Sequence, residues 1–187
     1  MRIRYNAPVT LTFALLSALV LFLDQLFGWG LIPAVFSVPG KAQFDFAVPA
    51  NWIRLFAHIA GHISWEHLLS NFAIILLLGP ILEEKYGTFS ILIMLLITAF
   101  ITGLLNAILL PNGLLGASGV AFMMILLVSF TNIRNGEIPL TFILILIFYL
   151  ANELITSFQE NQISEFAHIV GGACGSLFGF LRPRKQS

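Results

Sequence analysis

Six segments of this chain are mostly apolar, and each is a candidate for a helix that crosses a lipid bilayer. A membrane-spanning helix needs about 20 such residues, because each residue adds about 1.5 Å of rise. Of the 187 residues, 58% are hydrophobic and only 10% are charged, too few charges to cover the surface of a soluble domain. We therefore expect one all-α, polytopic membrane domain over residues 1–187. Its six predicted helices are residues 8–27, 65–82, 89–109, 117–132, 138–157 and 165–182.

The stretch of residues 28–64 is the one long connection between these predicted helices. Its first part is rich in glycine and proline, which predicts irregular structure. Its later part, around residues 52–62, is expected to form a short interfacial helix with Trp52 as the anchor. Arg2 and Arg4 before an apolar run could also indicate a cleaved signal peptide, but the run is long for one and no convincing small-x-small cleavage site follows.

Basic residues predict the orientation, because cytoplasmic loops carry an excess of Lys and Arg. With a cytoplasmic N-terminus and six spans, seven of the nine basic residues fall inside and two, Lys41 and Arg54, fall outside. The inner set is Arg2, Arg4, Lys85, Arg134, Arg182, Arg184 and Lys185. We expect a protein of the inner (plasma) membrane with both termini in the cytoplasm. A net charge of +0 gives no support for a nucleic-acid partner.

Four polar side chains lie near the outer ends of the second, fourth and sixth predicted helices. They are His67 and Asn71, Ser118, and His168. All three helices run from the outer side to the inner side, so these side chains share one depth if the helices touch. Polar groups inside a membrane are costly and usually functional, so we expect one site that opens to the outer, periplasmic side.

This set of side chains has the chemistry of a serine hydrolase. His168 is the candidate base for the Ser118 hydroxyl, because imidazole titrates near neutral pH. No Asp or Glu is an obvious third member, so a Ser–His dyad is expected. His67 and Asn71 are four residues apart on one helical face, and both can donate hydrogen bonds to an oxyanion. The N–H of Ser118, at a helix N-terminus, would add another donor.

Small residues repeat along the sixth predicted helix. Gly171 and Gly175 belong to a series at every fourth position, which lets two membrane helices pack closely. His168 shares their face, and the fourth predicted helix is the natural partner. Phe122, one turn after Ser118, could pack its ring on His168.

Several separated motifs resemble those of one known family, the rhomboid intramembrane serine proteases. They occur in the family's order from Arg54 to Gly179, so the set is far more specific than any single motif. The matching segments are HLLSN (His67 to Asn71), Gly79-xxx-Glu83-xxx-Gly87, Gly116-Ala117-Ser118-Gly119 and Ala167-His168-xx-Gly171-xxx-Gly175. Arg54 and His62 also fall where the family places them.

The resemblance implies a six-helix core with a water-filled cavity open to the outside. It implies Ser118 as the nucleophile, His168 as the base, and His67 and Asn71 as oxyanion donors. Substrates would be transmembrane segments of other proteins, entering sideways from the bilayer near the second and fifth helices. No metal or other cofactor is expected, and Phe122 stands where members often have Tyr. The residues expected to support the site structurally are Arg54, Glu83, Gly116, Gly119, Phe122, Gly171 and Gly175.

Two other functions fit parts of the pattern. His58 and His62 are four residues apart, and Glu66 and His67 follow, so a His-rich metal-binding membrane protein is one alternative. It leaves Ser118 without a role, and no HExxH motif is present. The other alternative is a non-catalytic rhomboid-like chaperone or scaffold, against which the presence of Ser118 and His168 argues. The oligomeric state stays open.

Overall fold

The computed structural model describes residues 5–130, 140, 143–144, 147 and 162–181. This part of the chain is helical, as the sequence predicts. The long helices described are α1 (Pro8–Phe27), α4 (Trp65–Tyr86), α5 (Thr88–Leu109), α6 (Ser118–Phe130) and α8 (Gln162–Leu181). Between α1 and α4 lie the short helices α2 (Leu31–Val35) and α3 (Pro49–Ala57) and the 3₁₀ turn η1 (His58–Ala60).

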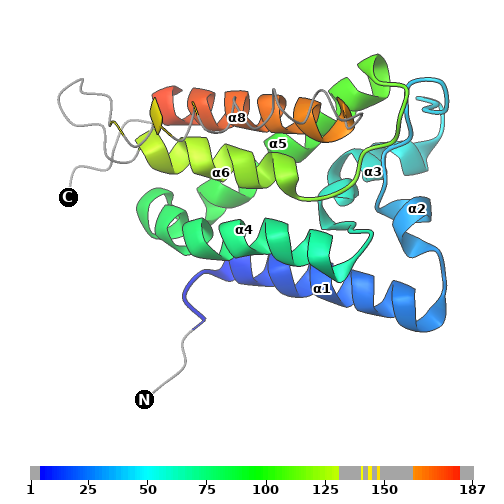
Figure 1. The fold of residues 1–187 in the computed structure, drawn as a ribbon, viewed down its shortest axis with the longest axis horizontal. Coiled ribbons are helices and arrows are strands. Elements are labelled where there is room, and N and C mark those ends of the chain that lie inside the picture. Colours follow the sequence, from blue (N-terminus) through cyan, green and yellow to red (C-terminus); the bar gives the residue numbers. More distant parts are fainter. Residues whose placement is uncertain (1–4, 131–139, 141–142, 145–146, 148–161, 182–187) are drawn as a thin grey trace.

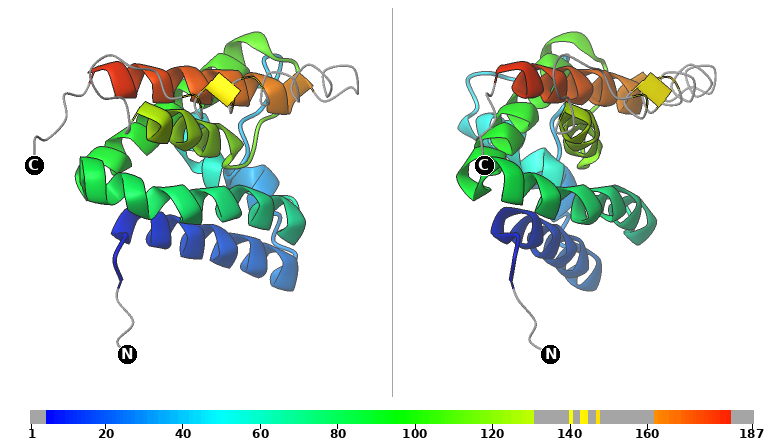
Figure 2. Two further views of the ribbon diagram at one scale, coloured as in Figure 1. Left: turned by 60° about the vertical axis from the view of Figure 1, so that its left-hand side comes forward. Right: turned by 90° about the vertical axis from the view of Figure 1, so that its left-hand side faces the viewer.

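The long helices form one bundle in which α6 lies between α4 and α8, and α1 packs on the far side of α4 (Figures 1 and 2). The starts of α4, α6 and α8 lie at the same end, together with α2 and α3 (Figure 1). The start of α1 and the end of α8 lie at the opposite end. The three helices that carry the candidate site residues therefore run in the same direction.

Within the described residues, the three helices α1, α4 and α5 are long and apolar enough to cross a membrane. Shorter apolar helices cover Ser118–Ser129 and Phe166–Leu181. The predicted helix 138–157 lies outside the described residues, apart from residues 140, 143–144 and 147. Large apolar side chains are exposed on the helices, as expected for contact with lipid. On α1 they are Leu15, Leu16, Leu19, Phe22, Leu26 and Phe27. An all-helical membrane protein is therefore supported, and the count of six spans stays a prediction.

The bounds of α1 agree with the predicted 8–27. Pro8 stands in its first turn, and Gly28 follows it in the left-handed conformation that commonly ends a helix. α4 continues to Tyr86 rather than ending at residue 82, because Glu83 is buried inside the fold instead of marking a solvated end. The predicted helix 52–62 is shifted to α3 and η1, since Pro49 supplies an earlier start.

Glu83 joins α4 to the start of α1. Its carboxylate accepts hydrogen bonds from the N–H and the hydroxyl of Thr10, at 2.7 and 2.6 Å, and from the N–H of Val9 at 3.2 Å. The first N–H groups of a helix have no intrahelical partner, so a carboxylate there is stabilising. A Cβ at Gly79 would lie 2.3 Å from the Thr10 hydroxyl oxygen, so the glycine permits this approach. Glu83 thus binds the polar groups at the N-terminal end of α1.

The loop of residues 28–64 is bonded into the fold by its main chain. Val38 and Leu114 exchange two hydrogen bonds of 2.8 and 2.9 Å as an isolated antiparallel bridge. The N–H of Lys41 donates to the carbonyl of Leu110 at 2.8 Å. The loop is therefore tied to the segment that leads into α6.

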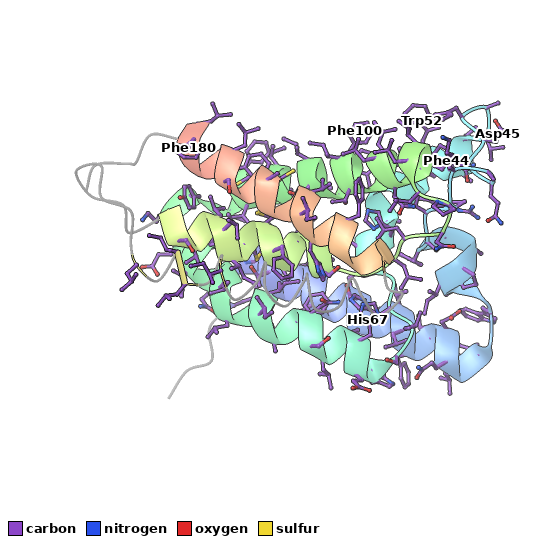
Figure 3. All side chains as sticks on the ribbon, turned by 45° about the horizontal axis from the view of Figure 1, so that its top comes forward. Phe44, Asp45, Trp52, His67, Phe100 and Phe180 are labelled. Carbon is purple, nitrogen blue, oxygen red and sulfur yellow. The ribbon has the colours of Figure 1, made fainter. Side chains whose placement is uncertain are left out.

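Arg54 holds the loop together from within. Its guanidinium donates to the carbonyl of Ala34 at 2.9 Å and to the side-chain oxygen of Asn51 at 3.1 Å, which links α3 to α2. Trp52 is 44% exposed beside it, and its indole N–H donates to the carbonyl of Phe46. Phe44, Asp45 and Trp52 gather at this end of the molecule (Figure 3).

Candidate active site

The segment that enters α6 at Ser118 has a fixed main chain. Gly116 has φ +109°, a conformation that L side chains rarely adopt. Its N–H donates to the carbonyl of His58 at 3.0 Å. The next N–H, that of Ala117, donates to Nε2 of His62 at 3.4 Å. Ser118 follows as the first residue of α6 and is partly exposed.

His67 and Asn71 of α4 face this segment. A Cβ at Gly116 would lie 2.8 Å from both Cε1 and Nε2 of His67, and 3.8 Å from Nδ2 of Asn71. Both side chains come from the first two turns of α4, and Figure 3 labels His67. The hydroxyl of Ser64, the N-cap, accepts the N–H of His67 at 3.1 Å and so helps to fix where α4 begins.

Two nitrogen atoms of these side chains have no hydrogen-bond partner in the described part of the chain. They are Nδ1 of His67 and Nδ2 of Asn71, and both are buried. Buried polar atoms in proteins nearly always have a partner, and exceptions often have a catalytic or ligand-binding reason. Both nitrogens can donate a hydrogen bond, His67 in the tautomer that carries its proton on Nδ1.

α6 and α8 touch through their backbones, as the repeat of small residues predicts. A Cβ at Gly171 would lie 2.0 Å from the carbonyl oxygen of Gly119, and one at Gly175 would lie 2.2 Å from that of Met123. A Cβ at Gly119 would in turn lie 3.1 Å from the carbonyl oxygen of Ala167. Glycine at these positions allows an approach that any larger residue would prevent.

His168 lies at this contact between α6 and α8. Its ring packs on that of Phe122, with the ring centroids 4.4 Å apart and the planes at 40°, as the sequence predicts. Phe122 is one turn after Ser118 on α6, and Ala167 next to His168 faces Gly119. The structure therefore places Ser118 and His168 on the two helices that approach each other most closely.

His58 and His62 bind different parts of the fold. Nε2 of His58 donates to the carbonyl of Ala99 in α5 at 3.1 Å, whereas Nε2 of His62 accepts the N–H of Ala117. Their spacing suits one helical face, but α3 ends at Ala57 and the chain tightens into η1. The residues that the structure describes contain no group of three or more His, Cys, Asp or Glu side chains that could hold a metal ion.

Both of these histidines are buried, and burial makes the charged form unfavourable. Desolvation lowers the pKa of His58 to about 4, although its hydrogen bond to the carbonyl of Ala99 opposes the shift. Desolvation, and then the neighbouring His67, lower the pKa of His62 to about 4. Both imidazoles are therefore neutral at pH 7.

The contact of His62 with Ala117 is the part of the site that sequence reasoning missed. In the sequence, His62 is marked only by its position in a family pattern and by its spacing from His58, which suggests a possible metal ligand. No local signal in the sequence relates residue 62 to residue 117, because the contact joins two segments far apart along the chain.

Comparison with known proteins gives consistent matches. The family model described as the Rhomboid domain matches residues 49–185. The rhomboid protease GlpG of Haemophilus influenzae is 25% identical over 187 residues, which cover 97% of this chain and 95% of that protein. RHOMBOID-like protein 1 of Arabidopsis thaliana is 31% identical over 141 residues, which cover 70% of this chain and 35% of that protein.

Proposed function

This chain belongs to the rhomboid family, and from that premise we propose that it is an intramembrane serine endopeptidase that cleaves transmembrane segments of other membrane proteins. One observation carries the proposal. The segment 116–119 lies between α4 and α8. α4 presents two buried donors that have no partner among the described residues, and α8 carries His168 at its closest contact with α6. A nucleophile at Ser118 would thus have hydrogen-bond donors on one side and a base on the other.

In this proposal Ser118 and His168 carry out the bond changes. His168 takes the proton as the Ser118 oxygen attacks the carbonyl carbon of the scissile peptide. The imidazolium then gives this proton to the departing amine, and an acyl-enzyme remains. A water molecule, activated by the same imidazole, hydrolyses the ester and releases the new carboxylate. No metal or other cofactor enters these steps.

His67 and Asn71 are proposed to stabilise the oxyanion. The negative charge that develops on the carbonyl oxygen needs donors that are already in place when it forms. The close approach of both side chains to Gly116 supports this role, as does the absence of other partners for their nitrogens within the described residues. The N–H at the start of α6 is the third proposed donor.

The proposed orientation puts the site on the outer, periplasmic side of an inner membrane. The shared end of α4, α6 and α8 supports a single depth for the four side chains. The excess of basic residues on the other side supports cytoplasmic termini.

The proposal is tested by reconstituting the protein in liposomes with a panel of tagged single-span proteins. We expect Ser118→Ala and His168→Ala each to lower the cleavage rate by at least about 10³-fold, and Asn71→Ala to lower it by about 10²-fold, since it removes one donor of several. Labelling by a fluorophosphonate should disappear in Ser118→Ala, while the melting temperature stays that of the wild type.

The outcomes separate the three functions. Cleavage retained by Ser118→Ala would end the hydrolase proposal. Activity that is lost with a chelator instead would support a metal site. If no substrate is cleaved and no label binds, the chain acts as a scaffold rather than an enzyme.

A further inference from the structure

We propose that His62 is a positioning residue of this hydrolase, which holds the N–H of Ala117 through Nε2 and thereby fixes the main chain that enters α6 at Ser118. The inference rests on the proposed function for its effect on catalysis. The contact itself is independent of that function and can be measured separately.

Two hydrogen bonds define the state of the His62 ring. Nδ1 is 3.3 Å from the carbonyl of Ala60, and a carbonyl can only accept, so Nδ1 carries the proton. Nε2 then has a lone pair, which accepts the N–H of Ala117 at 3.4 Å. The ring thus bridges η1 and the segment before α6, and it does so only as the neutral imidazole.

The ring has no room to turn away from this contact. His62 is 0% exposed, and its ring lies against His67 at 4.9 Å and Phe72 at 5.7 Å between centroids. The backbone just before it is also confined, because a Cβ at Gly61 would lie 2.2 Å from the carbonyl oxygen of Phe36. The direction of Nε2 is therefore set by packing rather than by the bond to Ala117 alone.

The contact acts on the site through two consecutive peptide planes. The N–H of Gly116 is held by the carbonyl of His58, and the N–H of Ala117 by the ring of His62. Fixing these planes also fixes the direction of the next N–H, that of Ser118. The proposed mechanism uses this N–H as an oxyanion donor, and such donors act only when they are aimed in advance.

Protonation of His62 would place an N–H against the N–H of Ala117 and break the contact. Among the residues that the structure describes, the titratable group against the ring is His67 on α4, whereas His58 turns its own ring to Ala99 in α5. The low pKa of His62, about 4, means that the contact persists at any pH where a catalytic histidine of ordinary pKa is neutral.

The test compares His62→Gln with His62→Leu in the full-length protein. The side-chain oxygen of glutamine can occupy the place of Nε2 and accept the N–H of Ala117, whereas leucine fills space without an acceptor. We expect His62→Leu to lower kcat by about 10- to 100-fold and to change KM by no more than about twofold. The reason is that the variant misplaces the N–H of Ser118 but leaves substrate binding intact. His62→Gln should recover most of this loss, and fluorophosphonate labelling should follow kcat.

Hydrogen exchange supplies a readout that does not depend on activity. The amide of Ala117 should exchange faster in His62→Leu than in the wild type, and at a nearly normal rate in His62→Gln. If His62→Leu does not fold, His62→Asn replaces it, because the asparagine side chain is too short for its oxygen to reach the N–H of Ala117.

Equal kcat and equal exchange in the glutamine and leucine variants would overturn the inference, as would a leucine variant with wild-type kcat. If the wild type itself shows no cleavage that depends on Ser118, the proposed function fails. The exchange rates would then still decide whether His62 holds Ala117.

Discussion

Replacing Gly171 by alanine should separate α6 from α8 and disable the proposed site. The added Cβ would lie 2.0 Å from the carbonyl oxygen of Gly119, 2.7 Å from its carbonyl carbon and 2.9 Å from its Cα. All three are backbone atoms of a helix, so no side chain can turn aside to relieve the overlap. Because a carbon–oxygen contact is normally about 3.3 Å or longer, the two backbones must move apart by about 1 Å.

The expected size of the effect follows from this displacement. Overpacking of this kind typically costs about 1–3 kcal/mol of unfolding free energy, although alanine in a helix returns about 1 kcal/mol relative to glycine. A 1 Å misplacement of catalytic groups can cost about 10²-fold in rate. We therefore expect a large loss of cleavage with only a modest loss of stability.

The neighbouring glycine offers a matched control. Within the described part of the chain, a Cβ at Gly172 would meet only Cγ of Leu126 at 3.7 Å, which is an ordinary contact. Gly172→Ala should therefore keep the wild-type kcat/KM and melting temperature, or melt slightly higher. The assay is cleavage of one tagged substrate by all three proteins in the same liposomes, with thermal unfolding measured in parallel. Wild-type activity in Gly171→Ala would refute the reasoning that these backbones touch.

Two further predictions concern stability. Glu83→Gln should lower the free energy of unfolding by about 1–3 kcal/mol, because a charged acceptor for Val9 and Thr10 is lost. The control is Glu84→Gln, at an exposed neighbouring position, which should leave the melting temperature unchanged. The free energy of unfolding should also fall as the pH drops from about 6.5 to about 4, since the imidazoles of His58 and His62 take up protons there in the unfolded chain but not in the folded one. The loss should approach about 3 kcal/mol for each histidine, and replacing both by glutamine should flatten the curve in denaturant titrations at several pH values.

The sequence was most informative about the long helices. Apolar runs with a proline at one end and a glycine at the other, as in α1, fix a helix between them with little help from the rest of the chain. The packing of α8 on α6 could also be predicted, because small residues at every fourth position indicate a helix face that packs closely on another helix.

Contacts of the long loop could not be predicted. Spacing alone allowed His58 and His62 to share a helical face, but α3 ends at Ala57. The His58 ring binds Ala99 in α5, and the His62 ring binds Ala117. A periodic pattern carries no information about where an irregular segment pairs along the chain. The bridge between Val38 and Leu114 is another contact of this kind.

That bridge has a mechanical consequence. The loop outside the bundle and the stretch before α6 share main-chain hydrogen bonds at Val38, Lys41 and His58. Each such bond contributes about 1 kcal/mol to stability, so moving the loop away from the bundle would cost several times that free energy. The same movement would displace Ser118. We therefore expect the loop of residues 28–64 to stay in place in the proposed enzyme, so that a transmembrane substrate would reach Ser118 between other elements of the fold.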